Sequence, residues 1–188
     1  MKFKFCPICG SELKEKYSWD EGGVPYCDLD DMMYFDTPKP CIIVAVIRDN
    51  KILLLKQSYI FKNSKVLLSG YVTSGENVEE TVHREVYEEA GIKIKDIKYL
   101  GSEYLESKEI LMLTFMAQYD GGDINKSSEV EWVDWSNIED ALCQMSEDLI
   151  GKRIVKKVLR EMSYTGNKAY RCEEGICNNG NCEINNHQ

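Results

Sequence analysis

One short segment constrains the fold of this chain more than any other. Its fixed positions are Gly70, Glu76, Arg84, Glu85, Glu88, Glu89 and Gly91. From Asn77 to Ala90 an apolar residue recurs at every fourth position, which predicts an amphipathic helix with Asn77 as its N-cap and Gly91 as its stop. At about 100° per residue, the three glutamates from Glu85 onward share one helix face, where like charges repel by roughly 0.2–0.5 kcal/mol per pair. Such a face requires a compensating cation.

The spacing of these residues favours a metal site over a solvated acidic surface. A run of acidic residues alone usually marks only a solvated helix face. Here Gly70 lets the backbone come close enough for its carbonyl to serve as one more oxygen ligand, and Arg84 is placed to pair with Glu76. Oxygen ligands suit Mg²⁺ or Mn²⁺, which bind carboxylates together with the phosphate oxygens of a substrate.

Gly70 to Ile92 matches every fixed position of the Nudix box, G-x5-E-x7-R-E-U-x-E-E-x-G-U with U apolar, so the chain resembles the Nudix hydrolases. The resemblance implies an α/β fold, built as an α/β/α sandwich with a mixed sheet. It also implies a metal-dependent hydrolase that cleaves a pyrophosphate linking a nucleoside to another moiety. The implied roles are Mg²⁺ ligation by Glu85, Glu89, Glu88 and the Gly70 carbonyl, catalysis by Glu88 and Arg84, and structural support by Glu76 and Gly91.

A further carboxylate outside the box often supplies a ligand or a base in proteins of this family. Glu129 precedes a predicted strand at 131–135, where a loop reaches the site, so Glu129 is the candidate catalytic base. Glu131 is the reserve candidate. The alternative for either residue is an exposed loop acid.

Three cysteines near the N-terminus have the spacing of a zinc ribbon. Cys6 and Cys9 form a C-x2-C turn, and Cys27 follows after seventeen residues. Asp30 occupies the fourth position, and zinc accepts a carboxylate oxygen there. The sequence leaves Asp28 or Asp31 open as substitutes, and also a ribbon that has lost its metal.

Apolar and β-branched runs predict a sheet around the acidic helix, followed by a second helix. The chain divides into a zinc ribbon at 1–36, a Nudix domain at 37–165 and a Cys- and Asn-rich tail at 166–188. The tail carries Cys172, Cys177 and Cys182, which could bind a metal, form disulfides or remain free thiols. The expected elements are a hairpin at 42–47 and 52–55, a strand at 66–72 interrupted at Ser69-Gly70, strands at 92–104, 109–119 and 131–135, and a helix at 147–162.

Charge and hydropathy exclude several classes of function. Lys and Arg number 23 against 32 Asp and Glu, a formal net charge of −9, which argues against broad binding of nucleic acid. No run of about 18 apolar residues is present, so no transmembrane helix is expected. The first residues lack the apolar stretch of a secretory signal, so a cytoplasmic location is expected. The expected partner is a small-molecule nucleotide, and the ribbon is expected to be structural, with homodimerisation as a further possible role.

The ribbon and the segment 34–40 make the chain similar to the NADH pyrophosphatase branch of the family. That branch has Cys at the position of Asp30, and it carries a Ser-Gln-Pro-Trp-Pro-Phe-Pro array where this chain has 102–107 and shares only Ser102. The array accompanies dinucleotide preference. Because the chain lacks this array, the resemblance supports pyrophosphate hydrolysis and not the choice of NADH. The expected function is Mg²⁺-dependent hydrolysis of the pyrophosphate bond in a nucleoside diphosphate linked to another moiety, with ADP-ribose or an NAD(H)-like dinucleotide as the substrate. The alternative is a nucleotide-sensing Nudix module whose ribbon contacts a partner or nucleic acid.

Overall fold

The computed structural model describes residues 3–57, 59–164, 177–178 and 181–182. The chain divides into two compact units, Met1–Pro38 and Lys39–Gln188. Each unit has its own sheet, so each is described separately.

The small unit is a three-stranded antiparallel sheet with very little apolar core. Its strands are β1 (Lys14–Ser18), β2 (Gly22–Cys27) and β3 (Met32–Met33), in the order β1-β2-β3. Among its described residues, only Cys6, Val24 and Cys27 are buried hydrophobic side chains. A unit with so few buried apolar groups does not fold on hydrophobic burial alone, which is the usual circumstance of a small metal-stabilised module.

The large unit is built on a mixed six-stranded sheet. Strand order is β7-β8-β4-β5-β9, and β6 pairs with β4. The β4–β8 pair is parallel, whereas the other pairs in the sheet are antiparallel. The strands are β4 (Lys39–Arg48), β5 (Lys51–Lys56), β6 (Leu68–Tyr71), β7 (Lys93–Leu105), β8 (Ile110–Gly121) and β9 (Trp132–Asn137).

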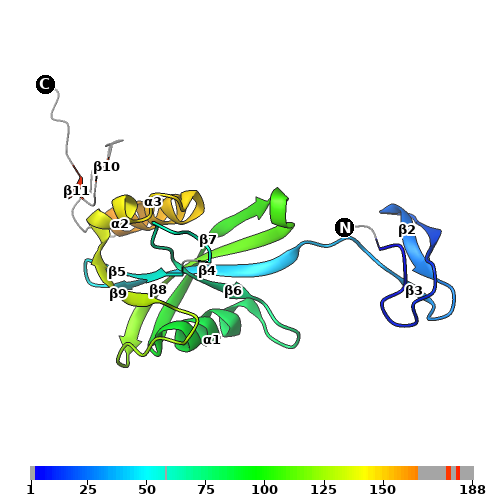
Figure 1. Ribbon diagram of the computed structural model, residues 1–188, viewed down its shortest axis with the longest axis horizontal. Coiled ribbons are helices and arrows are strands. Elements are labelled where there is room, and N and C mark those ends of the chain that lie inside the picture. The colour runs from blue at the N-terminus through cyan, green and yellow to red at the C-terminus, as the bar shows by residue number, and fades with distance from the viewer. Residues whose placement is uncertain (1–2, 58, 165–176, 179–180, 183–188) are drawn as a thin grey trace, which may run out of the picture. The chain divides into compact units, whose positions relative to one another are not determined.

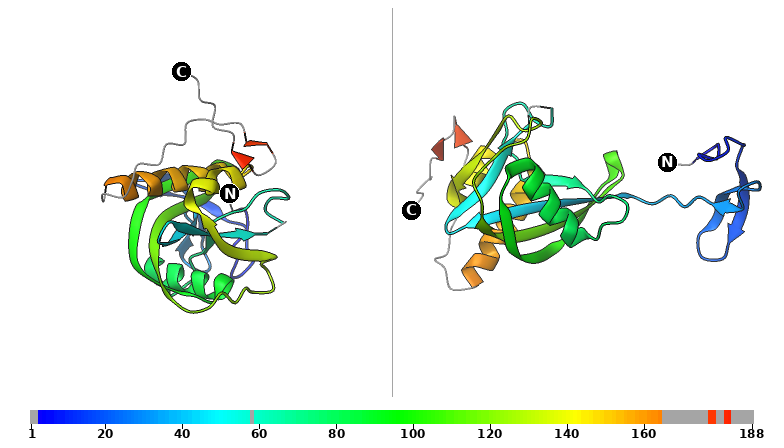
Figure 2. Two further views of the ribbon diagram at one scale, coloured as in Figure 1. Left: turned by 90° about the vertical axis from the view of Figure 1, so that its left-hand side faces the viewer. Right: turned by 90° about the horizontal axis from the view of Figure 1, so that it is seen from below.

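Helices cover both faces of this sheet, as Figure 1 shows and Figure 2 shows from below. Helix α1 (Val78–Ala90) lies on one face, and α2 (Ile138–Gln144) and α3 (Leu149–Tyr164) lie on the other. Alternate residues of β4 supply the two cores: Ile42 packs in the core that contains Val82 of α1, and Ile43 packs in the core that contains Val155 of α3. The predicted α/β/α sandwich with a mixed sheet is confirmed.

Helix α1 begins and ends at the residues that the sequence indicates. Asn77 Oδ1 accepts from the backbone N–H of Glu80, and the Glu80 carboxylate accepts from the N–H of Asn77, which completes a capping box. Gly91 ends the helix in the left-handed conformation, with φ of 74°. These two caps fix the position of the acidic face of α1 relative to the sheet.

One local expectation was wrong, and one helix was not expected. The predicted interruption at Ser69-Gly70 is absent, because both residues pair with β4 inside the continuous strand β6. Helix α2 was missed, because its seven residues are too few to establish a helical period in the sequence.

The C-terminal segment adds a short pair of strands, β10 (Cys177–Asn178) and β11 (Asn181–Cys182). The predicted roles of Cys172, Cys177 and Cys182 in metal binding or disulfides concern side chains outside the described residues. In the part of the chain that the structure describes, every helix is too short or too polar to span a membrane.

Candidate functional site

The carboxylate of Glu85 lies directly against the backbone of Gly70. Gly70 pairs with Ile42 in the β4–β6 ladder, and Glu85 projects onto it from α1. A Cβ atom added to Gly70 would lie 1.9 Å from Cδ and 2.0 Å from Oε1 of Glu85. Only glycine allows this approach, which brings a backbone segment of β6 beside an acidic side chain.

Glu89 is the acid whose surroundings most require a cation. Its side chain is 9% exposed, and Gln57 Nε2 donates to its Oε1 at 2.9 Å. Its Oε2 is buried and receives no hydrogen bond of standard geometry, although the Ser69 backbone is close enough to lower the pKa of this carboxyl slightly. Burial raises the pKa of Glu89 to about 7, and repulsion from Glu85 adds to this increase. A buried carboxylate oxygen without a donor, close to a second carboxylate, fits a divalent cation that would satisfy both.

Arg84 organises the acidic side chains rather than lining the cavity beside them. Its Nε and Nη2 donate to the carboxylate of Glu76 at 2.6 and 3.0 Å, a bidentate pair that connects the loop before α1 to the helix. Its Nη1 donates to Glu85 at 2.8 Å and to Glu88 at 3.0 Å. Hydrogen bonding to Arg84 lowers the pKa of Glu76 to about 2. The guanidinium therefore holds Glu85 and Glu88 in place.

A cavity of about 710 Å³ opens at this acidic cluster. One part of its wall is acidic, with Glu85, Glu88, Glu89 and Glu129, and Gly70 lies among them. Another part is apolar, and its residues belong to the core that α3 covers. The apolar lining includes Cys41, Ile43, Leu67, Leu105, Ile110 and Met112. An apolar wall beside an acidic face that could hold a cation suits a ligand with both an uncharged ring and a diphosphate.

The structure distinguishes between the two candidate bases. Glu129 lines the cavity, in the loop before β9. Glu131 is not among the lining residues, and its backbone N–H donates to the carbonyl of Lys56. Sequence reasoning missed Gln57, which orients Glu89, because a single glutamine after a strand carries no distinguishing pattern.

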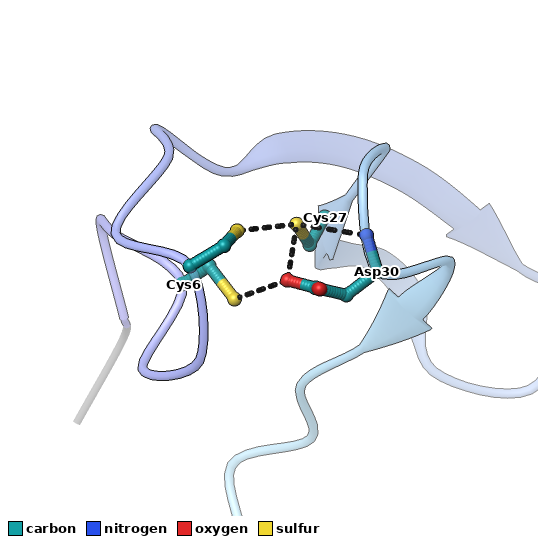
Figure 3. Close-up of side chains that lie close together, drawn as sticks. Cys6, Cys27 and Asp30 are labelled. Atoms are coloured by element: carbon teal, nitrogen blue, oxygen red, sulfur yellow. Dashed lines mark hydrogen bonds between the residues drawn. The ribbon is translucent and has the colours of Figure 1, made fainter.

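The four predicted metal ligands of the small unit lie together. One ligand atom each from Cys6, Cys9, Cys27 and Asp30 lies within 4.8 Å of the others, a set that could hold a metal ion. Asp30 Oδ2 accepts from Cys6 Sγ at 3.0 Å and from Cys27 Sγ at 3.2 Å (Figure 3). Hydrogen bonds from Cys9, Cys6 and Cys27 lower the pKa of Asp30, so its carboxylate is ionised and ready to ligate.

The alternatives to Asp30 are engaged elsewhere. Asp28 forms an ion pair with Lys14, and Asp31 accepts from the Tyr26 hydroxyl at 2.6 Å. Of the three aspartates that the sequence left open, the structure brings Asp30 to the thiols.

Comparison with known proteins identifies the family. The NUDIX domain family matches residues 37–158, and the chain belongs to this family. It is 36% identical over 140 residues to the NAD-capped RNA hydrolase NudC of Shigella dysenteriae serotype 1, an alignment covering 72% of this chain and 53% of that protein. It is 34% identical over 155 residues to NudC of Escherichia coli K12, covering 81% of this chain and 59% of that protein. The chain thus spans between half and three fifths of the length of these relatives.

Solved structures share the fold. A NUDIX hydrolase from Nitrosomonas europaea aligns with a TM-score of 0.68 at 21% identity, covering 90% of this chain and 97% of that one. The NUDIX domain of Shewanella oneidensis NrtR, solved with ADP ribose, aligns with a TM-score of 0.59 at 17% identity, covering 73% of this chain and 94% of that one. At these identities the likeness establishes the architecture alone.

Proposed function

We propose that this chain hydrolyses the pyrophosphate bond of a nucleoside diphosphate that is linked to another moiety. The observation that carries the proposal is the buried, unpartnered Oε2 of Glu89 beside Glu85 and Gly70, at the acidic wall of the cavity. Burying these acids together is costly without a cation, and a diphosphate is the ligand that shares divalent cations with carboxylates.

The metal ligands we propose are Glu85, Glu89, Glu88 and the carbonyl of Gly70, with Mg²⁺ or Mn²⁺ as the cation. A metal held by these residues would supply positive charge to neutralise the diphosphate and would lower the pKa of a bound water. Gln57 orients Glu89 by donating to its Oε1, and Arg84 orients Glu85 and Glu88. These two contacts would hold the three carboxylates in position around the metal.

Glu129 is the base we propose. Glu129 lines the cavity together with the acids of α1, and a carboxylate oxygen of Glu129 would accept a proton from the attacking water. The apolar wall at Ile43, Ile110 and Met112 would exclude bulk water from one side of the substrate and orient its ring.

ADP-ribose and NAD(H)-like dinucleotides are the substrates we propose. The relatives at 34–36% identity are named NAD-capped RNA hydrolases, and a structural neighbour holds ADP ribose. With Mg²⁺ present, purified protein should release AMP from ADP-ribose and NADH, as measured by chromatography. EDTA should abolish the release, and excess Mg²⁺ should restore it. Tight nucleotide binding without turnover across the panel would instead indicate the sensing module.

NAD-capped RNA is a second candidate substrate. The acidic composition argues against a nucleic-acid partner, whereas the relatives are named NAD-capped RNA hydrolases. To distinguish capped RNA from free dinucleotide as the substrate, cleavage of an oligonucleotide with a 5′ NAD cap is measured beside cleavage of NADH at equal concentration. Cleavage of NADH with an intact capped oligonucleotide would restrict the activity to small nucleotides.

We propose zinc as the metal of the small unit, held by Cys6, Cys9, Cys27 and Asp30. Three sulfur donors favour zinc over the hard cations proposed for the large unit. Because the unit buries so few apolar side chains, the metal would supply much of its folding free energy.

Removing one ligand should release this metal without affecting the large unit. Asp30→Ala and Cys27→Ser should each weaken zinc binding by at least about tenfold, as measured by competition with a chromogenic chelator. Asp28→Ala is the matched control, because Asp28 pairs with Lys14 outside the cluster. The melting of the large unit should be unchanged in all three variants. Equal zinc affinity in Asp30→Ala and Asp28→Ala would contradict the assignment of Asp30.

A further inference from the structure

Lys108 is the one basic side chain among the described residues that line the cavity. The other charged side chains on the wall are all acidic: Glu85, Glu88, Glu89, Glu129 and Asp148. A metal bound at the α1 acids would offset the charge at that end. An anionic group elsewhere in the cavity would meet a single protein cation, the Lys108 ammonium.

The backbone holds Lys108 in a defined position. It ends the short 3-10 helix Glu106–Lys108 between β7 and β8. Glu109 follows in the left-handed conformation, with φ of 53°, and its N–H donates to the Glu106 carbonyl at 3.2 Å. The Glu109 carbonyl accepts from Lys39 N at 2.9 Å, which fastens this turn to the start of β4. Lys108 thus lies in a turn whose backbone is hydrogen-bonded on both sides, and it lines the cavity wall.

Sheet topology separates Lys108 from the metal-binding acids. Strand β4 lies between β6 and β8, and Cys41 of β4 pairs with Tyr71 on one side and Met112 on the other. Glu85 contacts Gly70 of β6, whereas Lys108 precedes β8. Cys41 is within electrostatic range of Glu85, Glu89 and Lys108. The α1 acids that contact β6 and Lys108 before β8 therefore lie on opposite sides of β4, and both line the cavity together with Leu105 and Ile110.

We infer that Lys108 recognises a phosphate that the substrate carries outside the scissile diphosphate, such as a phosphate monoester on the ribose. The inference rests on the proposed function and narrows its substrate class. With the diphosphate at the α1 acids and an uncharged ring over β4, a further phosphate would reach the ammonium on the β8 side. A charge-assisted hydrogen bond there favours the phosphorylated substrate by about tenfold. Lys108 lies just beyond the segment 102–107, where the chain departs from the dinucleotide-preferring pattern.

The test compares NADPH with NADH, which differ by one ribose phosphate. The wild-type ratio of kcat/KM for NADPH over NADH should fall about tenfold in Lys108→Ala and further in Lys108→Glu, and Lys108→Arg should retain it. Lys51→Ala is the control, since Lys51 is exposed and lies beyond the other end of β4. A ratio unaltered by Lys108→Ala and Lys108→Glu, or a wild type that hydrolyses only NADH, overturns the inference.

A binding measurement decides the matter independently of turnover. Calorimetry with Mg²⁺ compares adenosine 2′,5′-bisphosphate with AMP on the full chain. The wild type should bind the bisphosphate more tightly, and Lys108→Glu should lose that advantage while its affinity for AMP changes little. Should neither dinucleotide nor ADP-ribose be hydrolysed, the proposed function fails, and this binding comparison alone tests Lys108. Equal loss of affinity for both ligands overturns the inference.

Discussion

Glu89→Gln should reduce metal-dependent hydrolysis by roughly 10²–10³-fold, because the neutral amide removes a ligand from the most buried part of the acidic cluster. The Gln57 contact to this side chain need not be lost, since an amide oxygen still accepts a hydrogen bond. The fold should therefore survive. The measurement is kcat/KM for ADP-ribose across a Mg²⁺ titration.

The same substitution should stabilise the metal-free protein at neutral pH. The folded-state pKa of Glu89 is raised from 4.5 to about 7, so the folded chain holds a proton that the unfolded chain releases. The contribution of Glu89 to the free energy of unfolding is therefore fully present below pH 4.5. It is lost as the pH rises to about 7, which lowers the free energy of unfolding by about 3 kcal/mol. Thermal melting in EDTA at pH 5 and pH 7.5 should show a smaller decline in Glu89→Gln than in wild type.

Glu79→Gln is the matched control for both effects. It is the same substitution in the same helix, at an exposed position in the first turn. It should leave the activity and the pH dependence of melting close to wild type. Undiminished Mg²⁺-dependent hydrolysis in Glu89→Gln would remove Glu89 from the proposed ligands. If the decline in melting temperature between pH 5 and pH 7.5 were the same as in wild type, the burial of Glu89 would not destabilise the protein.

Gly70→Ala should abolish most of the activity at little cost in stability. The added Cβ would meet the carboxylate of Glu85, so that carboxylate must move away from the site. The displaced group is the far end of a flexible side chain, so the fold accommodates it cheaply. We expect a loss of roughly 10²-fold or more in kcat/KM, and a change in the free energy of unfolding below about 1 kcal/mol.

Gly101→Ala provides the opposite pattern. Gly101 lies in β7 with φ of +120°, a conformation that strains an L side chain, and its Cβ would approach no carboxylate of the site. This variant should lose stability, by about 1 kcal/mol or more, while retaining kcat/KM. If Gly70→Ala kept full activity, the contact between Gly70 and Glu85 would have no bearing on catalysis.

Local patterns in the sequence were sufficient to predict the large unit and its acidic helix. The four-residue apolar period, the N-cap Asn77 and the stop at Gly91 are local properties, and the structure confirms each of them. The hairpin of β4 and β5 was also predictable, because two β-rich runs flank a short turn. The short helix α2 was not, because tertiary packing rather than periodicity supports it.

The sequence could not decide which of several neighbouring acidic residues occupies a site. Asp28, Asp30 and Asp31 have the same chemistry within four positions, and only the fold shows that Asp30 meets the thiols. Glu129 and Glu131 are two residues apart, and only the loop before β9 brings one of them to the cavity. A sequence pattern shows which side chains are present, but the conformation of the folded backbone determines which of them faces the site.

The sequence by itself determined the acids of one helix face, because they follow from spacing along a regular element, and the match to the Nudix box implied the family and its mixed sandwich. Only the tertiary structure showed the unpartnered Oε2 of Glu89, its contact with Gln57 and the place of Lys108 across β4 from the acids. These features join residues from separate strands and helices. Their burial and distances depend on how the elements pack, which no local period records.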